Sequence, residues 1–192
     1  MSNSTRPPDY LKDSVAALTE GGYTTSDVWY HGTSSALIES ILQAGLKRSG
    51  DQAMQAAAEK TMATIGNSYQ AATEPVYLAP SKELAYYWAQ QTVRRRGARF
   101  AGDEQPVVLM VNLPDRLNAQ VKPDVGAATL LLVGEGEEYM GYVARMYQDR
   151  GLDGPDIDLM KADRLEYLHT LGMAYIDADI DAMHLQLLKD AS

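Results

Sequence analysis

The sequence predicts a mixed α+β fold rather than a regularly alternating α/β fold. Short runs of β-branched and aromatic residues, typical of strands, are interspersed with segments whose apolar residues recur at helical spacing. The two kinds of segment follow no repeating strand–helix unit, which a doubly wound parallel sheet requires. No internal repeat or long low-complexity tract is present. We therefore expect residues 1–192 to form one domain.

The composition limits the kind of protein. The 192 residues carry a formal net charge of −9 and include no cysteine, which excludes disulfides, thiolate metal sites and a thiol nucleophile. The acidic balance argues against broad nucleic-acid binding. No apolar run reaches the roughly 20 residues of a membrane helix. Residues 1–9 are polar and proline-bearing, so we expect a flexible start rather than a secretory signal. We expect a cytoplasmic site of action, with secretion lacking a signal peptide as the alternative.

In the first half of the chain, helical spacing and capping residues predict four helices, at 10–19, 34–44, 51–64 and from Ser81 onward. Gly45 stands where a glycine commonly ends a helix. Branched and aromatic residues predict short strands at 28–30, ended by Gly32, and at Val76–Leu78. Four arginines then lie close together in a predicted loop: Arg94, Arg95, Arg96 and Arg99. We interpret them as solvated, with a patch for an acidic ligand as the alternative.

In the second half, the clearest strand is 107–113, between Pro106 and Pro114. Further strands are predicted at 128–133 and 173–180, and a short closing segment at 183–188. Apolar residues at helical spacing predict helices at 137–150 and 157–171. We expect most of residues 137–171 to be helical and peripheral.

Residues suited to ligand binding gather where the first aromatic strand ends. His31 offers a ring nitrogen at the turn, and Gly32 lets a ligand approach the backbone closely. Thr33 and Ser34 add hydroxyl groups that can serve a ligand or cap the next helix. The alternative is an ordinary strand end followed by an ordinary helix cap.

Four segments, taken in order, resemble ADP-ribosyltransferases of the diphtheria toxin and poly-ADP-ribose polymerase branch. They are 29–34 with 41–46, then 76–89, 106–113 and 174–180. The resemblance covers 28–115 well and 172–188 loosely, whereas 116–171 is atypical of the family and reads as a partly helical insertion. It implies an ADP-ribosyltransferase-like fold, with two small, mainly antiparallel sheets around an NAD cleft and peripheral helices.

The resemblance also implies roles for individual residues. His31 would hydrogen-bond the ribose in the adenosine half of NAD, and the backbone of Gly32 would hold the nicotinamide carboxamide. Tyr77 would stack on the nicotinamide ring, for which an aromatic plane is required. We include Thr33 in the NAD-binding set and regard His31 and Tyr77 as the catalytic pair.

Two further contacts are implied, each with an alternative. Tyr87 would cover the other face of the nicotinamide ring, and Trp88 is the alternative if the alignment shifts by one residue. Arg48 would meet the pyrophosphate of NAD. The alternative for Arg48 is a solvated side chain.

The sequence departs from the family at its third catalytic position. The glutamate that would contact the nicotinamide ribose aligns with Ala174, which carries no carboxylate. Glu166 is a possible replacement, as are Glu135, Glu137 and Glu138. For each of these a solvated surface acid is the simpler interpretation. We therefore do not expect elongation to a polymer.

No metal site is expected, because Asp153, Asp156 and Asp158 lack calcium-loop spacing and His169 and His184 stand alone. We expect a mono-ADP-ribosyltransferase that uses NAD as substrate and modifies a protein or a nucleic acid. One alternative is a non-catalytic module that binds NAD or ADP-ribose. An RNA 2′-phosphotransferase is another, although that branch has histidine where Tyr77 stands. The last is an interaction domain with an accidental resemblance.

Overall fold

The computed structural model describes residues 6–66, 68, 73–126 and 134–190. Within these ranges the chain is a mixed α and β protein with two three-stranded antiparallel sheets and one short hairpin. The first sheet has the order β3-β5-β8, with β3 at Val28–Ser34, β5 at Pro106–Asn112 and β8 at Leu185–Leu187. The second has the order β4-β7-β6, with β4 at Val76–Leu78, β7 at Ala174–Ile176 and β6 at Lys122–Pro123. The hairpin pairs β1 (Leu18–Thr19) with β2 (Gly22–Tyr23).

The two sheets meet at a single antiparallel bridge. Tyr30 of β3 and Ala79, just after β4, exchange two backbone hydrogen bonds of 2.8 and 2.9 Å. A second bridge joins Leu46 to Ile180 in the same way, with both bonds at 2.9 Å. The first of these bridges holds the long strand β3 and the short strand β4 edge to edge, which positions the site described below.

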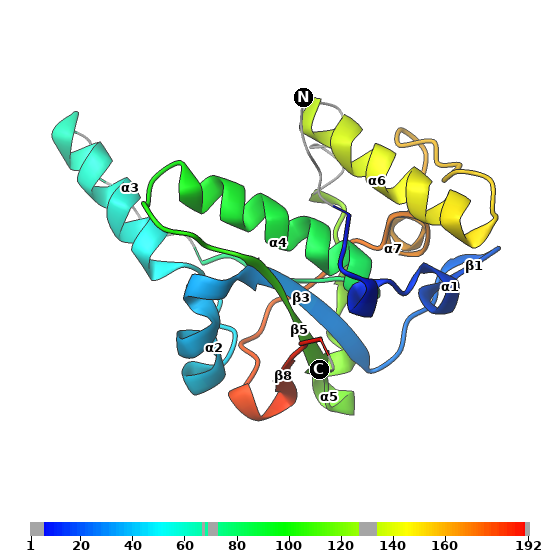
Figure 1. Ribbon diagram of the computed structural model, residues 1–192, viewed down its shortest axis with the longest axis horizontal. Helices are drawn as coiled ribbons and strands as arrows, with labels where there is room; N and C mark the ends of the chain where they lie inside the picture. The colour runs from blue at the N-terminus through cyan, green and yellow to red at the C-terminus, as the bar shows by residue number, and fades with distance from the viewer. Residues whose placement is uncertain (1–5, 67, 69–72, 127–133, 191–192) are drawn as a thin grey trace.

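Seven α-helices lie in the described part of the chain, together with short 3-10 turns. They are α1 (Ser14–Ala17), α2 (Ile38–Ala44), α3 (Gln52–Thr64), α4 (Lys82–Gly97), α5 (Asp115–Asn118), α6 (Gly134–Arg150) and α7 (Arg164–Leu171). Figure 1 shows α4 lying along β3 and β5, with α6 and α7 grouped beyond it, while α3 projects away from the rest of the molecule. No described residue of α3 is buried. In the described ranges no helix combines the length and apolar character needed to cross a membrane.

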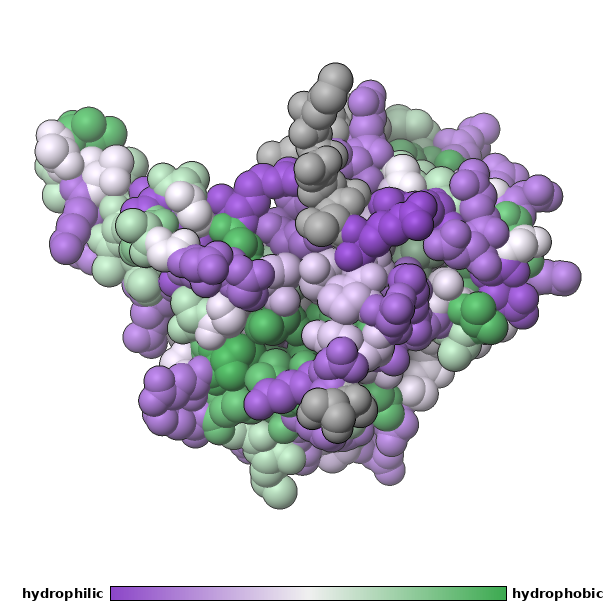
Figure 2. Space-filling view, in the orientation of Figure 1, coloured by the Kyte–Doolittle hydropathy of each residue, from purple (hydrophilic) through white to green (hydrophobic). Residues whose placement is uncertain are grey.

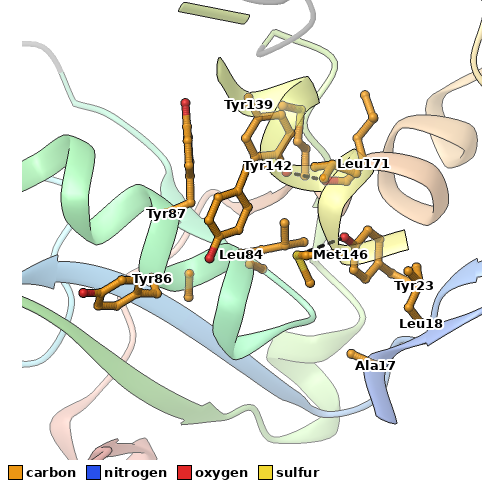
Figure 3. Packing of buried hydrophobic residues seen from close by; sticks show 14 of the residues in the cluster. Ala17, Leu18, Tyr23, Leu84, Tyr86, Tyr87, Tyr139, Tyr142, Met146 and Leu171 are labelled. Carbon is orange, nitrogen blue, oxygen red and sulfur yellow. Dashed lines mark hydrogen bonds between the residues drawn. The ribbon is translucent and has the colours of Figure 1, made fainter. Parts of the chain in front are cut away.

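Buried side chains form two clusters. One lies among α1, α4, α6 and α7 and is rich in tyrosine (Figure 3). The other joins the inward faces of the two sheets, with Trp29 and Leu109 from the first and Val76 and Ile176 from the second. Apolar side chains on the face seen in Figure 2 gather around α2, β5 and β8, where half-buried Ile38 and other residues extend the second cluster toward the surface.

A glycine allows α4 to pack directly on β3. A Cβ atom at Gly32 would lie 1.8 Å from the carbonyl oxygen of Ala85 and 2.7 Å from the amide nitrogen of Ala89. Real Cβ contacts are never this short, so only glycine fits between strand and helix. The need for glycine here comes from helix packing.

Several predicted elements are confirmed. The strand at Val76–Leu78 and the helices at 51–64 and 137–150 occur close to their expected bounds, as does the strand at 107–113. Ser34 and Ser81 cap the helices that follow them. Gly45 ends α2 with a φ of 86°, a left-handed value that favours glycine.

Other predictions about the first half are wrong. The helix expected at 10–19 is a 3-10 turn followed by the four-residue α1, because Leu18 leaves the helix to pair with Tyr23 in the hairpin. Of residues 1–9, only 6–9 are described, and Asp9 begins that turn. The strand expected at 28–30 does not end at Gly32 but continues to Ser34, since its ladder with β5 runs that far. Arg94, Arg95 and Arg96 form the last turn of α4 rather than a loop, a position where the helix dipole favours cations.

The second half also differs in places. The helix expected at 157–171 begins only at Arg164, where Asp163 and Glu166 form a capping box. The strand expected at 173–180 stops at Ile176, and the closing segment contributes β8 to the other sheet. Helix α6 is not peripheral, because its Tyr139 and Val143 are fully buried. The strand expected at 128–133 lies outside the described residues.

Candidate functional site

The structure brings His31 and Tyr77 together at the seam between the sheets. The Nδ1 atom of His31 lies 2.9 Å from the backbone carbonyl oxygen of Tyr77. A carbonyl oxygen can only accept, so Nδ1 carries the hydrogen and donates it. Burial lowers the pKa of His31, and the hydrogen bond to Tyr77 only partly opposes this effect. The neutral ring therefore presents Nε2 as an acceptor for a hydroxyl group.

The side chain of Tyr77 faces away from the apolar core. Its neighbours Val76 and Leu78 are buried, whereas Tyr77 is 49% exposed, as strand alternation dictates. Tyr175 stands directly opposite Tyr77, and Lys122 directly opposite Tyr175. Register partners share a face, so Lys122, Tyr175 and Tyr77 form one row across the second sheet. The Lys122 Nζ atom lies 5.9 Å from the centre of the Tyr175 ring.

Charged groups surround the Tyr77 hydroxyl. Burial raises the pKa of Tyr77, and the negative charges of Asp124 and Glu74 raise it further. The positive charge of Arg95 opposes them and lowers this pKa. The half-exposed side chain of Tyr77 is thus influenced by acidic and basic residues, of which Glu74 is near in the chain and Asp124 and Arg95 are more distant.

The backbone of Gly32 faces the same seam. Backbone groups alternate between the two edges of a strand, and those of Tyr30 point to Ala79 rather than to β5. The N–H and C=O of Gly32, two residues further along β3, therefore point toward the β4 side as well. Thr33 behaves differently, because it is only 2% exposed and holds its side chain within the protein. A direct contact between the Thr33 side chain and a ligand would require this region to open.

Tyr87, expected to cover a bound ring, lies in the tyrosine-rich core. It is 3% exposed, and its ring centre lies 5.1 Å from those of Trp88 and Tyr139 and 5.2 Å from that of Tyr142. Figure 3 shows Tyr87 on α4 beside Tyr139 and Tyr142 of α6. Trp88 is only half-buried. Of the two alternatives, Trp88 is the less buried.

Arg48 lies at the end of the second sheet and is engaged with acidic residues. Its Nη2 atom is 3.7 Å from a carboxylate oxygen of Asp177, and its backbone N–H donates to Asp179 at 2.8 Å. Its carbonyl oxygen accepts a 2.9 Å bond from the backbone N–H of Glu74. The Nε atom is buried without a hydrogen-bond partner in the described part of the chain. An anion would therefore compete with Asp177 for this guanidinium.

The arginines of this run differ in their contacts and in their burial. Arg96 is buried and forms ion pairs with Asp51 and with Glu104, the latter at 2.6 Å. Arg94 pairs with Glu138 at 3.2 Å near the surface. Arg95 is exposed, and its positive charge lowers the pKa of Tyr77. Of the four arginines interpreted as solvated, Arg94, Arg95 and Arg99 are exposed, whereas Arg96 is buried.

The acidic residues that could replace the absent glutamate have other partners or lie elsewhere. Glu166 accepts the backbone N–H of Asp163 at 2.6 Å and so caps α7. Glu138 is paired with an arginine, and Glu137 is exposed on α6. The side chain of Glu135 lies outside the described part. The sequence offered no signal for Asp124, which approaches Tyr77 only through the pairing of distant strands.

One described cavity is separate from this seam. It has a volume of about 580 Å³ and lies between the N-terminal segment and α6, with Lys12, Lys82 and Arg145 among its lining residues. At its edge, Asp13 and Glu83 cap one another's segments: Glu83 accepts the N–H groups of residues 13 and 14 at 2.8 and 2.9 Å. No group of three or more metal-ligating side chains occurs among the residues that the structure describes.

Comparison with known proteins gives no relative from which a function could be transferred. No protein-family model matches this chain, and no curated protein or solved structure matches it significantly. The functional argument therefore rests on the site itself and on the sequence motifs that form it.

Proposed function

We propose that this protein is an NAD-dependent mono-ADP-ribosyltransferase with an ADP-ribosyltransferase-like fold. NAD would be its substrate, and a protein or a nucleic acid would be the acceptor. The observation that carries the proposal is the seam between the sheets, where the His31 ring bonds the backbone of Tyr77 at 2.9 Å beside the backbone edge of Gly32. These are the residues for which the sequence motifs imply contacts with NAD.

Each group at the seam offers a contact that NAD can use. The Nε2 atom of neutral His31 accepts a hydrogen bond from a ribose hydroxyl. The Gly32 backbone has one donor and one acceptor, which match the carbonyl and amide of the nicotinamide carboxamide. The ring of Tyr77, 49% exposed, provides an aromatic plane for stacking.

This reaction depends more on the alignment of NAD with the acceptor than on covalent participation by the protein. The bond between nicotinamide and ribose breaks, its electron pair leaves with nicotinamide, and the ribose becomes cationic. The acceptor then attacks the ribose carbon and loses a proton to water. Holding NAD and acceptor in register contributes much of such a rate enhancement.

The test is single-turnover cleavage of labelled NAD with a cell lysate as the source of acceptor, followed by separate analysis of protein and nucleic acid. We expect His31→Ala and Tyr77→Ala each to lower the rate by at least about tenfold, because the lost contacts orient the substrate. Tyr77→Phe, which retains the ring, and His184→Ala, which removes a histidine at the other end of the chain, should stay close to wild type. Equal loss in His184→Ala would contradict the assignment of His31.

A second candidate function is a non-catalytic module that binds NAD or ADP-ribose. Ala174, where the resemblance implies a glutamate, is apolar and buried against the sheet core. The same experiment separates the two functions. A wild-type protein that is stabilised by NAD, by about 2.7 kcal/mol at a hundredfold excess over the dissociation constant, yet cleaves none of it, would be such a module.

A further inference from the structure

Asp124 projects from the second sheet toward the Tyr77 side. Strand β6 pairs with β7 through Lys122 opposite Tyr175 and Pro123 opposite Ala174. The backbone N–H of Asp124 donates to the carbonyl oxygen of Met173 at 2.9 Å, which continues this pairing by one residue. Alternation therefore places Asp124 on the same face as Lys122, and hence on the face of Tyr77.

The spacing between Asp124 and Tyr77 suits a ligand held between them. Tyr77 lies on one outer strand of the three-stranded sheet, and Asp124 directly follows the other, β6, with Tyr175 on the strand between. Adjacent strands are about 4.8 Å apart, and Asp124 lies two residues, about 7 Å, beyond Lys122, the residue in register with Tyr77. The backbones of Asp124 and Tyr77 are therefore separated by roughly 12 Å. This separation leaves room for a ribose beside a ring stacked on Tyr77.

The surroundings of Asp124 allow its negative charge to act on nearby groups. The residue is half-buried, and one carboxylate oxygen lies over Gly126, 3.3 Å from where a Cβ atom would stand there. Its negative charge raises the pKa of Tyr77 and that of the buried Tyr139. Glu74 also acts on Tyr77 but is exposed, and water screens an exposed charge more strongly.

We propose that Asp124 is the catalytic residue that stabilises the cationic ribose as nicotinamide leaves. This inference rests on the proposed transferase function. The carboxylate acts through its negative charge: it faces the carbon whose bond to nicotinamide breaks, and it neither accepts the departing electron pair nor forms a bond. It supplies from β6 the negative charge that Ala174 on the neighbouring strand cannot.

The experiment compares Asp124→Asn, Asp124→Glu and the control Glu74→Gln with wild type in single-turnover NAD cleavage, NAD binding and thermal unfolding. A lost electrostatic contact to the transition state costs about 10²–10³ in rate. We expect Asp124→Asn to be slower by roughly 100-fold while its NAD affinity and melting temperature stay near wild type. Asp124→Glu, which retains the charge, should recover most of this loss, and Glu74→Gln should change the rate little.

The two Asp124 variants also separate catalysis from a purely structural role. Asparagine caps backbone turns as well as aspartate does, whereas glutamate does so poorly. If Asp124 only holds the backbone near Gly126, Asp124→Asn will match wild type and Asp124→Glu will be the worse variant, which would overturn the inference. An equal loss in Glu74→Gln would also overturn it. A wild-type protein that cleaves no NAD would instead refute the proposed function, and this inference with it.

Discussion

Replacing Arg96 by methionine should destabilise the fold strongly, because this side chain is the shared cation of a buried ion-pair network. The Arg96 side chain is 8% exposed, and it binds Asp51 at the start of α3 and Glu104 before β5. Its bonds to Glu104, at 2.6 and 3.0 Å, form a bidentate pair. Methionine would leave two mostly buried carboxylates close together without a cation. Breaking a buried pair in this way costs about 3–5 kcal/mol.

We expect a loss near the lower end of this range, about 3 kcal/mol, because both carboxylates keep some contact with water. For a chain of this size that corresponds to a fall in melting temperature of roughly 6–12 °C. Urea unfolding followed by circular dichroism measures the free energy directly. Arg94→Met is the matched control, because its ion pair with Glu138 is exposed and should contribute at most about 1 kcal/mol. Equal losses in the two variants would refute the reasoning.

Two further predictions concern stability. Gly32→Ala should prevent stable folding, because its Cβ would lie 1.8 Å from a backbone oxygen of α4, whereas Gly97→Ala, with nothing within 4 Å, should be tolerated; similar melting temperatures for the two variants would contradict this. The Arg96 guanidinium and a hydrogen bond from Ser34 hold the pKa of Glu104 below its ordinary value of 4.5. The stability from this pair is therefore present above that value and lost as pH falls through the lower, folded-state pKa. Glu104→Gln should remove this part of the acid loss, so the unfolding free energies of variant and wild type should converge only as pH falls below the lowered, folded-state pKa of Glu104.

The location of the candidate site links the proposed ligand-binding role to the fold. His31 and Tyr77 belong to different sheets, and they meet because Tyr30 and Ala79 form the bridge between those sheets. Helix α4 packs against the same strand at Gly32. A change that moves α4 would therefore also displace the His31 ring, even where it removes none of the proposed contacts with NAD.

Local sequence patterns predicted much of the secondary structure and part of the site. Ser81 and Gly45 marked helix ends correctly because capping depends on neighbouring backbone groups alone. The short run of branched and aromatic residues at Val76–Leu78 correctly identified a strand. The strand segment at His31 could likewise be identified as a candidate ligand-binding feature, because its residues are adjacent in the chain.

Local patterns failed where a residue's environment comes from a distant segment. Tyr87 has the spacing of a helix-face aromatic, but only the packing of α6 on α4 decides that it is buried. Within the arginine run, the solvated interpretation failed for Arg96, because its partners Asp51 and Glu104 come from other elements.

The sequence by itself determined the α+β character, most helix and strand positions, and the His31–Gly32 and Tyr77 motifs. Only the tertiary structure decided that β8 joins β5, that Gly32 is required by α4, and that Asp124 reaches the Tyr77 face through β6. The physical reason is that helical and strand periodicity tells which side of a segment is buried but not what covers it. Strand pairing between residues far apart in the chain depends on the whole packed core, and no short stretch of sequence encodes that choice.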